Sequence, residues 1–199
     1  IEDAQGKNFK INGFTAKVDK NIDFDKTANY FVATASNATL TVGDDVEGDA
    51  IIWLDNPARN GSIFKGDIKT LDASSATVKT ELAGNDLDNT ILAGNGDASL
   101  WGGNGGNDLL IGGAGKNTFF FATANGHDVI QGAHDGDLVS LEDIYYDDVV
   151  RADITNSGAV IELADGSTLE IQSTAAIDYR LQDGSTYTAD RTNREWVQK

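Results

Sequence analysis

The stretch GGAGKNTFF, residues 112–120, combines three glycines with a polar sixth residue and an apolar eighth residue. Glycine is suited to tight turns because it adopts positive φ without steric cost. Threonine and phenylalanine are instead enriched in β-strands. Glycines this frequent therefore predict many tight turns, and hence many short strands.

The nine-residue pattern recurs in the middle of the chain. It aligns over residues 84–92, 93–101, 102–111, 112–120, 123–131 and 132–140. The eighth position is always apolar and is occupied by Ile91, Leu100, Leu110, Phe119, Ile130 and Val139. A fixed short period of this kind is typical of a repeat architecture, in which stacked units share one continuous core. We expect these six side chains to form that core.

The pattern resembles the repeats-in-toxin (RTX) family of calcium-binding proteins, whose nonapeptide reads Gly-Gly-x-Gly-x-Asp-x-apolar-x. The resemblance covers residues 84–140. It implies that the first six residues of a unit turn around Ca²⁺, that the last three form a short parallel strand, and that two units complete one coil. It also implies a bacterial protein that folds outside the cell.

The sixth positions carry the candidate metal ligands. They read Asn89, Ala98, Asp108, Asn117, Asp128 and Asp137, so three of the six keep the aspartate of the family. Calcium takes six to eight oxygen ligands, which carboxylates, amides and backbone carbonyls can supply together. The candidate carbonyls are those of Gly103, Gly106, Gly113, Gly115 and Gly126. The alternative is that the aspartates cap their own turns and the glycines serve the backbone conformation alone.

If two units make one coil, alternate sixth positions share a side of the stack. This places Asn89, Asp108 and Asp128 in a first column and Ala98, Asn117 and Asp137 in a second. Because affinity should follow carboxylate count, we expect the best calcium site between Asp108 and Asp128. A weaker site is expected between Asn117 and Asp137, and none at Ala98.

The flanking regions are also β-type. Residues 1–83 contain short strand-like runs at 30–32, 39–42 and 51–54, which either form irregular β structure or extend the repeat. In residues 141–199, Asp165-Gly166 and Asp183-Gly184 each separate two strand-like runs. These are hairpin signals of the kind that favours a primed turn, and they predict an antiparallel cap over the end of the stack.

The charge of the chain limits its partners. Thirty-two acidic and fifteen basic residues give a net charge of −17, which repels nucleic acid and anionic membranes. No apolar run is long enough for a membrane span. There is no cysteine, so thiol chemistry is excluded. The start at Ile1, without a methionine or a signal peptide, is expected of a piece excised from a longer chain.

The familiar catalytic motifs are missing: there is no His-Glu-x-x-His, no Gly-x-Ser-x-Gly and no P-loop. Aspartates in glycine turns are expected to be solvated, a poor setting for a general acid with a raised pKa. His127 and His134 occupy variable repeat positions and are expected to be exposed. For Trp53, Trp101 and Trp196 we expect packing in the core or at its rim, the alternative being stacking on sugars.

These observations predict an all-β fold: a right-handed parallel β-roll (β-solenoid) over 84–140, a β-rich N-terminal segment (1–83) and a hairpin-rich C-terminal cap (141–199). The expected function is that of a non-catalytic, calcium-binding structural module in a secreted or surface protein such as a toxin or adhesin. Its partners would be calcium, the parent polypeptide, and a surface glycan or host protein. The alternatives are a metal-independent adhesive or ligand-binding solenoid and, less favoured, a polysaccharide-active enzyme.

Overall fold

The computed structural model describes residues 8–11, 14–18, 22–25, 30–33, 38–42, 50–54 and 64–199. Within these residues the chain is built from β-strands, with a single 3-10 turn, η1 (Tyr146–Asp148), and no α-helix. The predicted all-β class is confirmed.

Ten strands form a first sheet, here called sheet I, in the order β1-β2-β5-β8-β10-β12-β14-β18-β17-β16. Every neighbouring pair from β5 to β18 is parallel, whereas the pairs at both ends are antiparallel. The strands are β1 (Asn8–Ile11), β2 (Phe14–Val18), β5 (Ala38–Val42), β8 (Ile68–Asp72), β10 (Thr90–Leu92), β12 (Leu109–Ile111), β14 (His127–Gln131), β16 (Val149–Ile154), β17 (Ala159–Leu163) and β18 (Thr168–Gln172).

Eight strands form sheet II, in the order β21-β20-β19-β15-β13-β11-β9-β6. The pairs from β6 to β19 are parallel, and β20 and β21 add an antiparallel end. The strands are β6 (Ala50–Trp53), β9 (Thr80–Ala83), β11 (Ala98–Trp101), β13 (Asn117–Ala122), β15 (Leu138–Glu142), β19 (Asp178–Arg180), β20 (Thr186–Asp190) and β21 (Glu195–Gln198). A small third sheet contains β3 (Ile22–Asp25), β4 (Tyr30–Ala33) and β7 (Phe64–Lys65).

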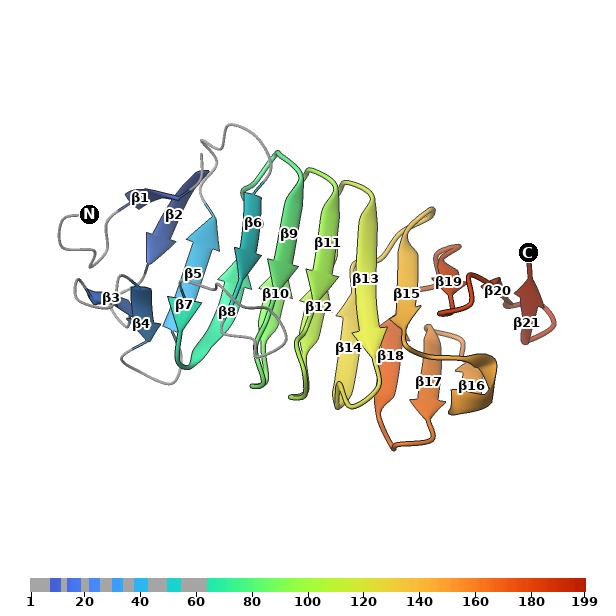
Figure 1. Cartoon of the computed structure of the whole chain (residues 1–199). Coiled ribbons are helices and arrows are strands. Elements are labelled where there is room, and N and C mark those ends of the chain that lie inside the picture. Colours follow the sequence, from blue (N-terminus) through green and yellow to red (C-terminus); the bar gives the residue numbers. More distant parts are fainter. Residues whose placement is uncertain are drawn as a thin grey trace.

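Successive strands of the repeat alternate between the two sheets. From β8 to β15 the chain forms one strand in sheet I, the next in sheet II, and then returns to sheet I beside the strand before last. Figure 1 shows this progression from the N-terminal to the C-terminal end of the molecule. Each nine-residue unit supplies one turn and one strand, as its glycine-rich and apolar halves predict.

The six apolar eighth positions lie at the centre of the molecule. All of them are fully buried, and they belong to a single core cluster to which both sheets contribute. Ile91 is paired with Leu110, and Leu110 with Ile130, across sheet I. The prediction that these positions form the core is confirmed. It succeeded because one apolar inward residue recurs in every unit at nearly the same spacing.

The described strands on either side of the repeat use the same two sheets. In residues 38–83, β5 and β8 join sheet I while β6 and β9 join sheet II, so this part extends the stack. After the repeat, β18 pairs in parallel with β14, and β19 pairs in parallel with β15. The C-terminal region therefore continues both sheets with the parallel strands β18 and β19, and antiparallel strands (β17 and β16 in sheet I, β20 and β21 in sheet II) lie beyond them at the sheet ends. All three strand-like runs predicted in residues 1–83 coincide with β4, β5 and β6.

Both predicted hairpins form, but the predicted turn type is wrong. Gly166 N–H donates to Leu163 O (3.0 Å) and Leu163 N–H to Ser167 O (2.9 Å), which defines a three-residue loop rather than a two-residue primed turn. Gly166 has φ +88°, but Asp165 does not adopt the positive φ that a type I′ turn requires. The Asp165 carboxylate instead accepts the N–H of Ser167 (2.8 Å), two residues later. Aspartate commonly makes this contact in turns, and Asp165 does so without adopting a positive φ. The second hairpin repeats this arrangement.

Glycines in the turns allow neighbouring coils to touch. A Cβ atom added to Gly113 would lie 1.7 Å from Gly94 O, and one added to Gly126 would lie 1.8 Å from Gly106 O. Gly113 has an ordinary negative φ, so its requirement for glycine is purely one of space. The turns therefore stack at the spacing of the strands only when these positions have no side chain.

We predict that Gly113→Ala lowers the free energy of unfolding by about 3 kcal/mol, since the methyl group would overlap a backbone oxygen that cannot move alone. The matched control is Gly136→Ala. Gly136 has φ +89° but no atom within 4 Å of an added Cβ, so its cost is backbone strain of about 1–2 kcal/mol. Denaturant unfolding measures both. An equal or smaller loss in Gly113→Ala would contradict the stacking explanation.

Candidate polar columns inside the stack

The sixth-position side chains form the two columns that the sequence predicts. Strand pairing stacks the units that carry Asn89, Asp108 and Asp128 along sheet I. It stacks the units that carry Ala98, Asn117 and Asp137 along sheet II. All six residues are buried.

The expectation that the aspartates are solvated is wrong. Asp108 is 1% exposed, Asp128 2% and Asp137 1%. The reason lies in the period of the β-strand: the sixth and eighth positions are two residues apart, so their side chains point to the same side. Because the eighth position faces the core, the sixth faces inward as well.

The buried carboxylates link neighbouring coils. Asn89 N–H donates to Asp108 Oδ1 (2.7 Å), and Asp108 N–H donates to Asp128 Oδ1 (3.0 Å). In the second column, Asn117 N–H donates to Asp137 Oδ1 (2.8 Å). These partners are 19 or 20 residues apart, the separation of neighbouring strands in the same sheet. The alternative that these aspartates simply cap their own turns therefore does not describe Asp108 and Asp128.

The other oxygens of the first column have no partner. Asp108 Oδ2 and Asp128 Oδ2 are buried, and neither makes a hydrogen bond. A Cβ added to Gly102 would lie 2.0 Å from Asp108 Oδ2, so this oxygen packs directly against the backbone of its own turn. A buried carboxylate oxygen without a partner is costly, and the column contains two of them.

This environment raises the pKa of both carboxyl groups. Burial, followed by the negative charge of Asp128, raises the pKa of Asp108 to about 8. Burial raises the pKa of Asp128 to about 7, against the opposing effect of the hydrogen bond that its carboxylate accepts from the backbone N–H of Asp108. In the absence of a cation, the first column therefore retains protons near neutral pH.

Asparagine fills the same position without a charge. In Asn89, Oδ1 accepts the N–H of Asn85 (2.8 Å) and Nδ2 donates to Ile68 O (3.0 Å) in the preceding coil. The side chain thus caps its own turn and binds a neighbouring one. An aspartate cannot make the second contact, because an ionised carboxylate has no donor.

Asn117 does the same in the second column. Its Nδ2 lies near three oxygens: Gly113 O (3.2 Å), Gly115 O (2.9 Å) and Asp137 Oδ2 (3.1 Å). These are oxygens of the kind that would coordinate a cation. In this structure the amide nitrogen of Asn117 lies among these three oxygens and donates hydrogen bonds to them.

His134 adds a second nitrogen to this group. Its Nε2 lies 3.1 Å from Gly113 O and 2.8 Å from Gly115 O, and its Nδ1 lies 3.5 Å from Asp137 Oδ1. Burial opposes protonation, but the charge of Asp137 and the nearby carbonyls raise the pKa of His134 above its ordinary value. The predicted exposure is confirmed for His127, whereas His134 is only partly exposed and hydrogen-bonded.

The other predicted carbonyl ligands already have roles in the stack. Gly103 O accepts a hydrogen bond from Asn125 Nδ2 (2.6 Å), and Gly126 O accepts the N–H of Thr168 (2.9 Å). Gly106 O packs against Gly126, as described above. Sequence reasoning missed Asn125 and His134. One feature of the sequence could have pointed to Asn125. It lies three residues before Asp128, in a repeat unit that does not begin with the usual pair of glycines.

Among the residues that the structure describes, no three histidine, cysteine, aspartate or glutamate side chains surround one point in a way that could hold a metal ion. Any cation in the first column would therefore need backbone carbonyls to complete its ligands. No helix in the described part of the chain is long and apolar enough to cross a membrane. The chain matches no protein-family model and no curated protein.

We predict that the metal-free protein loses stability as the pH rises from about 5 to above 8. The pKa values of Asp108 and Asp128 are above the value of 3.8 for a free carboxyl, so over this range the folded state holds protons that the unfolded state has released. Melting temperatures in chelator measure the effect. Asp108→Asn keeps an oxygen for the N–H of Asn89 but cannot ionise, and should flatten the profile.

His134 shifts stability in the same direction, so the decisive quantity is the difference between the parent and Asp108→Asn. The matched control is Asp97→Asn, which removes a charge from an exposed turn position. A parent profile that stays flat, or an Asp108→Asn profile with the same slope as the parent, would contradict the assignment.

Proposed function

We propose that this chain is a calcium-binding structural module, a parallel β-roll from a larger secreted or surface protein. The observation that supports it best is the pair of stacked carboxylates, Asp108 and Asp128. Both are buried, and each has one oxygen without a hydrogen-bond partner. A divalent cation would supply the partner for both oxygens and replace the protons that the column otherwise retains.

The arrangement of strands supports the β-roll. Turn and strand alternate in units of about nine residues, and the strands fall into two parallel sheets that share a core. Such a stack buries apolar side chains along one inner face and gathers the turns along its sides. The RTX resemblance predicts the same division between calcium-binding turns and short strands.

Calcium suits the site better than magnesium. Calcium accepts six to eight oxygens in a flexible geometry, whereas magnesium demands an octahedral shell and releases its waters reluctantly. The first column offers two carboxylates, and turn carbonyls would have to complete the oxygen shell. Asn89 would form its uncharged end, since its amide nitrogen already binds the preceding coil.

The second column supports a cation less well. Asn117 Nδ2 and His134 Nε2 already donate toward the carbonyls of Gly113 and Gly115. These nitrogens occupy the place that a metal would need. We therefore propose that the second column is held together without calcium.

The module is proposed to be non-catalytic. Asp108 and Asp128 have raised pKa values, as a general acid would, but at 1% and 2% exposure no substrate can reach them. Secretion follows from the proposed need for calcium, which is abundant outside the cell. The parent polypeptide would use the roll as a folding and spacing element.

We predict that calcium raises the melting temperature of metal-free protein at pH 7.5 and that magnesium does so far less. At a calcium concentration ten times the dissociation constant, one site adds about 1.4 kcal/mol to the free energy of unfolding. Asp108→Asn should abolish most of the rise, while Asp97→Asn should keep it. Equal melts in calcium and chelator, or an unchanged response in Asp108→Asn, would reject the proposed site.

A second variant probes the other column. Asn117→Asp would place a carboxylate among the oxygens of Gly113, Gly115 and Asp137 and would remove the amide donor. We expect the variant to be destabilised in chelator at pH 8 and to respond to calcium more strongly than the parent. Unfolding curves with and without calcium test this, and a variant as stable as the parent in chelator would refute the role given to the Asn117 amide.

A further inference from the structure

The outer face of sheet II contains a row of aromatic side chains. Trp101 is paired with Phe120 on the next strand and with Ala83 on the strand before, and Ala83 is paired with Trp53. Along each strand, side chains that point inward alternate with side chains that point outward. The four paired residues, Trp53, Ala83, Trp101 and Phe120, are on the outward side of sheet II. Trp53, Trp101 and Phe120 are each partly exposed.

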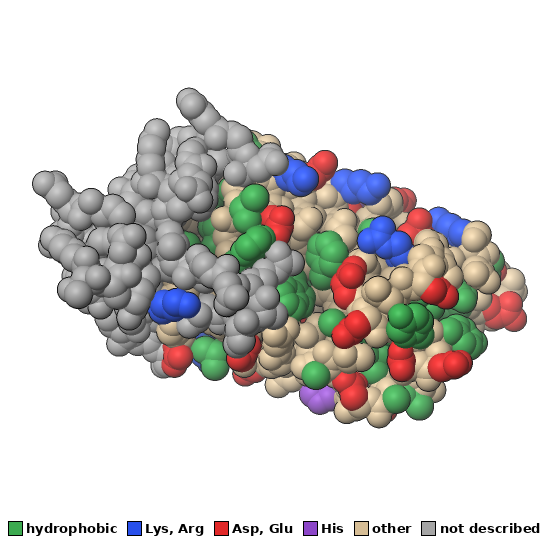
Figure 2. Space-filling model, viewed as in Figure 1, with side chains coloured by type: hydrophobic (Ala, Val, Ile, Leu, Met, Phe, Trp, Pro, Cys, Tyr) green, Lys and Arg blue, Asp and Glu red, His purple; other side chains and the backbone are tan. Residues whose placement is uncertain are grey.

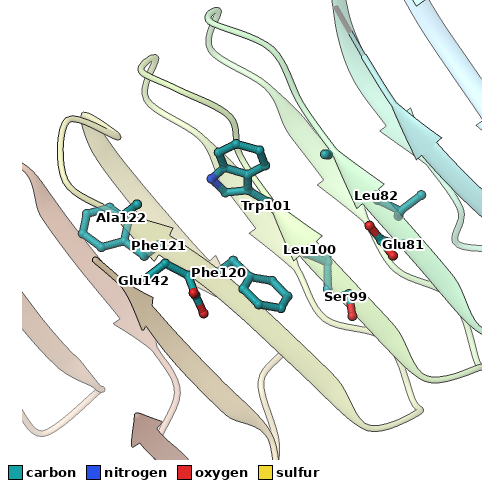
Figure 3. A pocket seen from close by; sticks show the side chains of 10 residues that line it. Glu81, Leu82, Ser99, Leu100, Trp101, Phe120, Phe121, Ala122 and Glu142 are labelled. Carbon is teal, nitrogen blue, oxygen red and sulfur yellow. The ribbon is translucent and has the colours of Figure 1, made fainter. Parts of the chain in front are cut away.

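A shallow groove of about 360 Å³ crosses this face. Its lining residues come from the four neighbouring strands β9, β11, β13 and β15, so the groove runs across the strands. Figure 3 shows the rings of Trp101 and Phe120 on neighbouring strands, with the carboxylates of Glu81 and Glu142 on either side. Figure 2 shows apolar side chains close to acidic ones on the described surface of this view.

The lining has a specific chemistry. Among its ten residues are two carboxylates and no lysine, arginine or histidine. Carboxylates accept hydrogen bonds and cannot donate them, so the polar groups of an occupant should be donors. The aromatic rings offer flat apolar faces between the two acceptors. Together with the net charge of −17, this composition disfavours any anionic ligand.

We propose that this groove binds a neutral β-linked glycan whose chain runs across the strands of sheet II. A pyranose ring with equatorial hydroxyls has two flat C–H faces for the aromatic rings and a rim of hydroxyl donors for carboxylates. Glu81 Oε1 already accepts the Trp53 indole N–H (2.9 Å) and Glu142 Oε1 accepts Ser140 Oγ (2.5 Å), so sugar hydroxyls would add to these hydrogen bonds on carboxylates that are held in place. Trp53 lies on β6, beside the groove and outside its lining, and it is two strands from Trp101, about 9.5 Å at ordinary strand spacing. That spacing is close to the two-sugar repeat of an extended β-1,4-linked chain, so alternate sugars would contact the two indoles.

Other occupants fit less well. A peptide adding itself as a strand needs a free sheet edge, whereas the groove lies on the face of the sheet, where backbone groups are already paired. A proline-rich peptide could use the aromatic rings but has few donors for the two carboxylates. This inference does not depend on the calcium proposal, because none of the groove residues belongs to the polar columns.

The test is calorimetric titration with cellohexaose of the folded protein in calcium. Maltohexaose, whose α-linkages prevent a flat extended chain, and the anionic polymer polygalacturonate are the comparison ligands. We expect binding of cellohexaose alone. Trp101→Ala should weaken it at least tenfold and Glu142→Gln several-fold, because each removes a groove contact without touching the core.

The matched control is Ile111→Ala, a partly exposed residue in sheet I, which should leave binding unchanged. Far-ultraviolet circular dichroism and melting curves establish that each variant is folded. No heat with cellohexaose, equal binding of maltohexaose, or binding of an oligoproline peptide in its place would overturn the proposal. Retained cellohexaose affinity in folded Trp101→Ala would overturn it as well.

Discussion

The interior of this protein is governed by the stacking of polar side chains at one coil spacing. Position six of every repeat points into the stack because it lies two residues before a core position, in the strand or directly before it. Each polar side chain there meets its counterpart from the next coil, away from water. The fold must therefore provide a hydrogen bond, a proton or a cation at every step of the column.

The two columns meet this requirement differently. In the second column, the Asn117 amide and the His134 ring donate hydrogen bonds to the surrounding oxygens, and the carboxylate of Asp137 is fully used. In the first column, two successive aspartates offer only acceptors, and their pKa values rise to about 8 and about 7. The columns differ in that Asn117 supplies an amide donor where the first column has the carboxylate of Asp108, which can only accept.

Much of the architecture could be predicted from the sequence because the repeat constrains it. The apolar residue at position eight identified the core, and the nine-residue period placed Asp108 and Asp128 in one column. The same two-residue period also implies that these aspartates are buried, although their place in glycine-rich turns favoured exposure to solvent. The loop around Asp165 could not be assigned from its Asp-Gly pair, because the Asp165 side chain binds the backbone of Ser167 and selects a longer turn.

Other features depended on contacts between distant residues. His134 sits at a variable repeat position, and its role follows only from the carbonyls of Gly113 and Gly115 one coil earlier. Strands β18 and β19 continue both sheets after a long hairpin insertion that interrupts the repeat. The aromatic row likewise requires the register between strands, since Trp53, Trp101 and Phe120 are far apart in sequence but aligned across sheet II.

The most direct test of the central claim is the number of protons released when calcium binds. Calorimetric titration of metal-free protein near pH 6.5, in two buffers with different protonation enthalpies, measures that number. If calcium replaces the protons of Asp108 and Asp128, binding should release protons, the number should fall as the pH rises through about 8, and Asp108→Asn should lose the effect. Calcium binding without proton release, or no binding at all, would contradict the account.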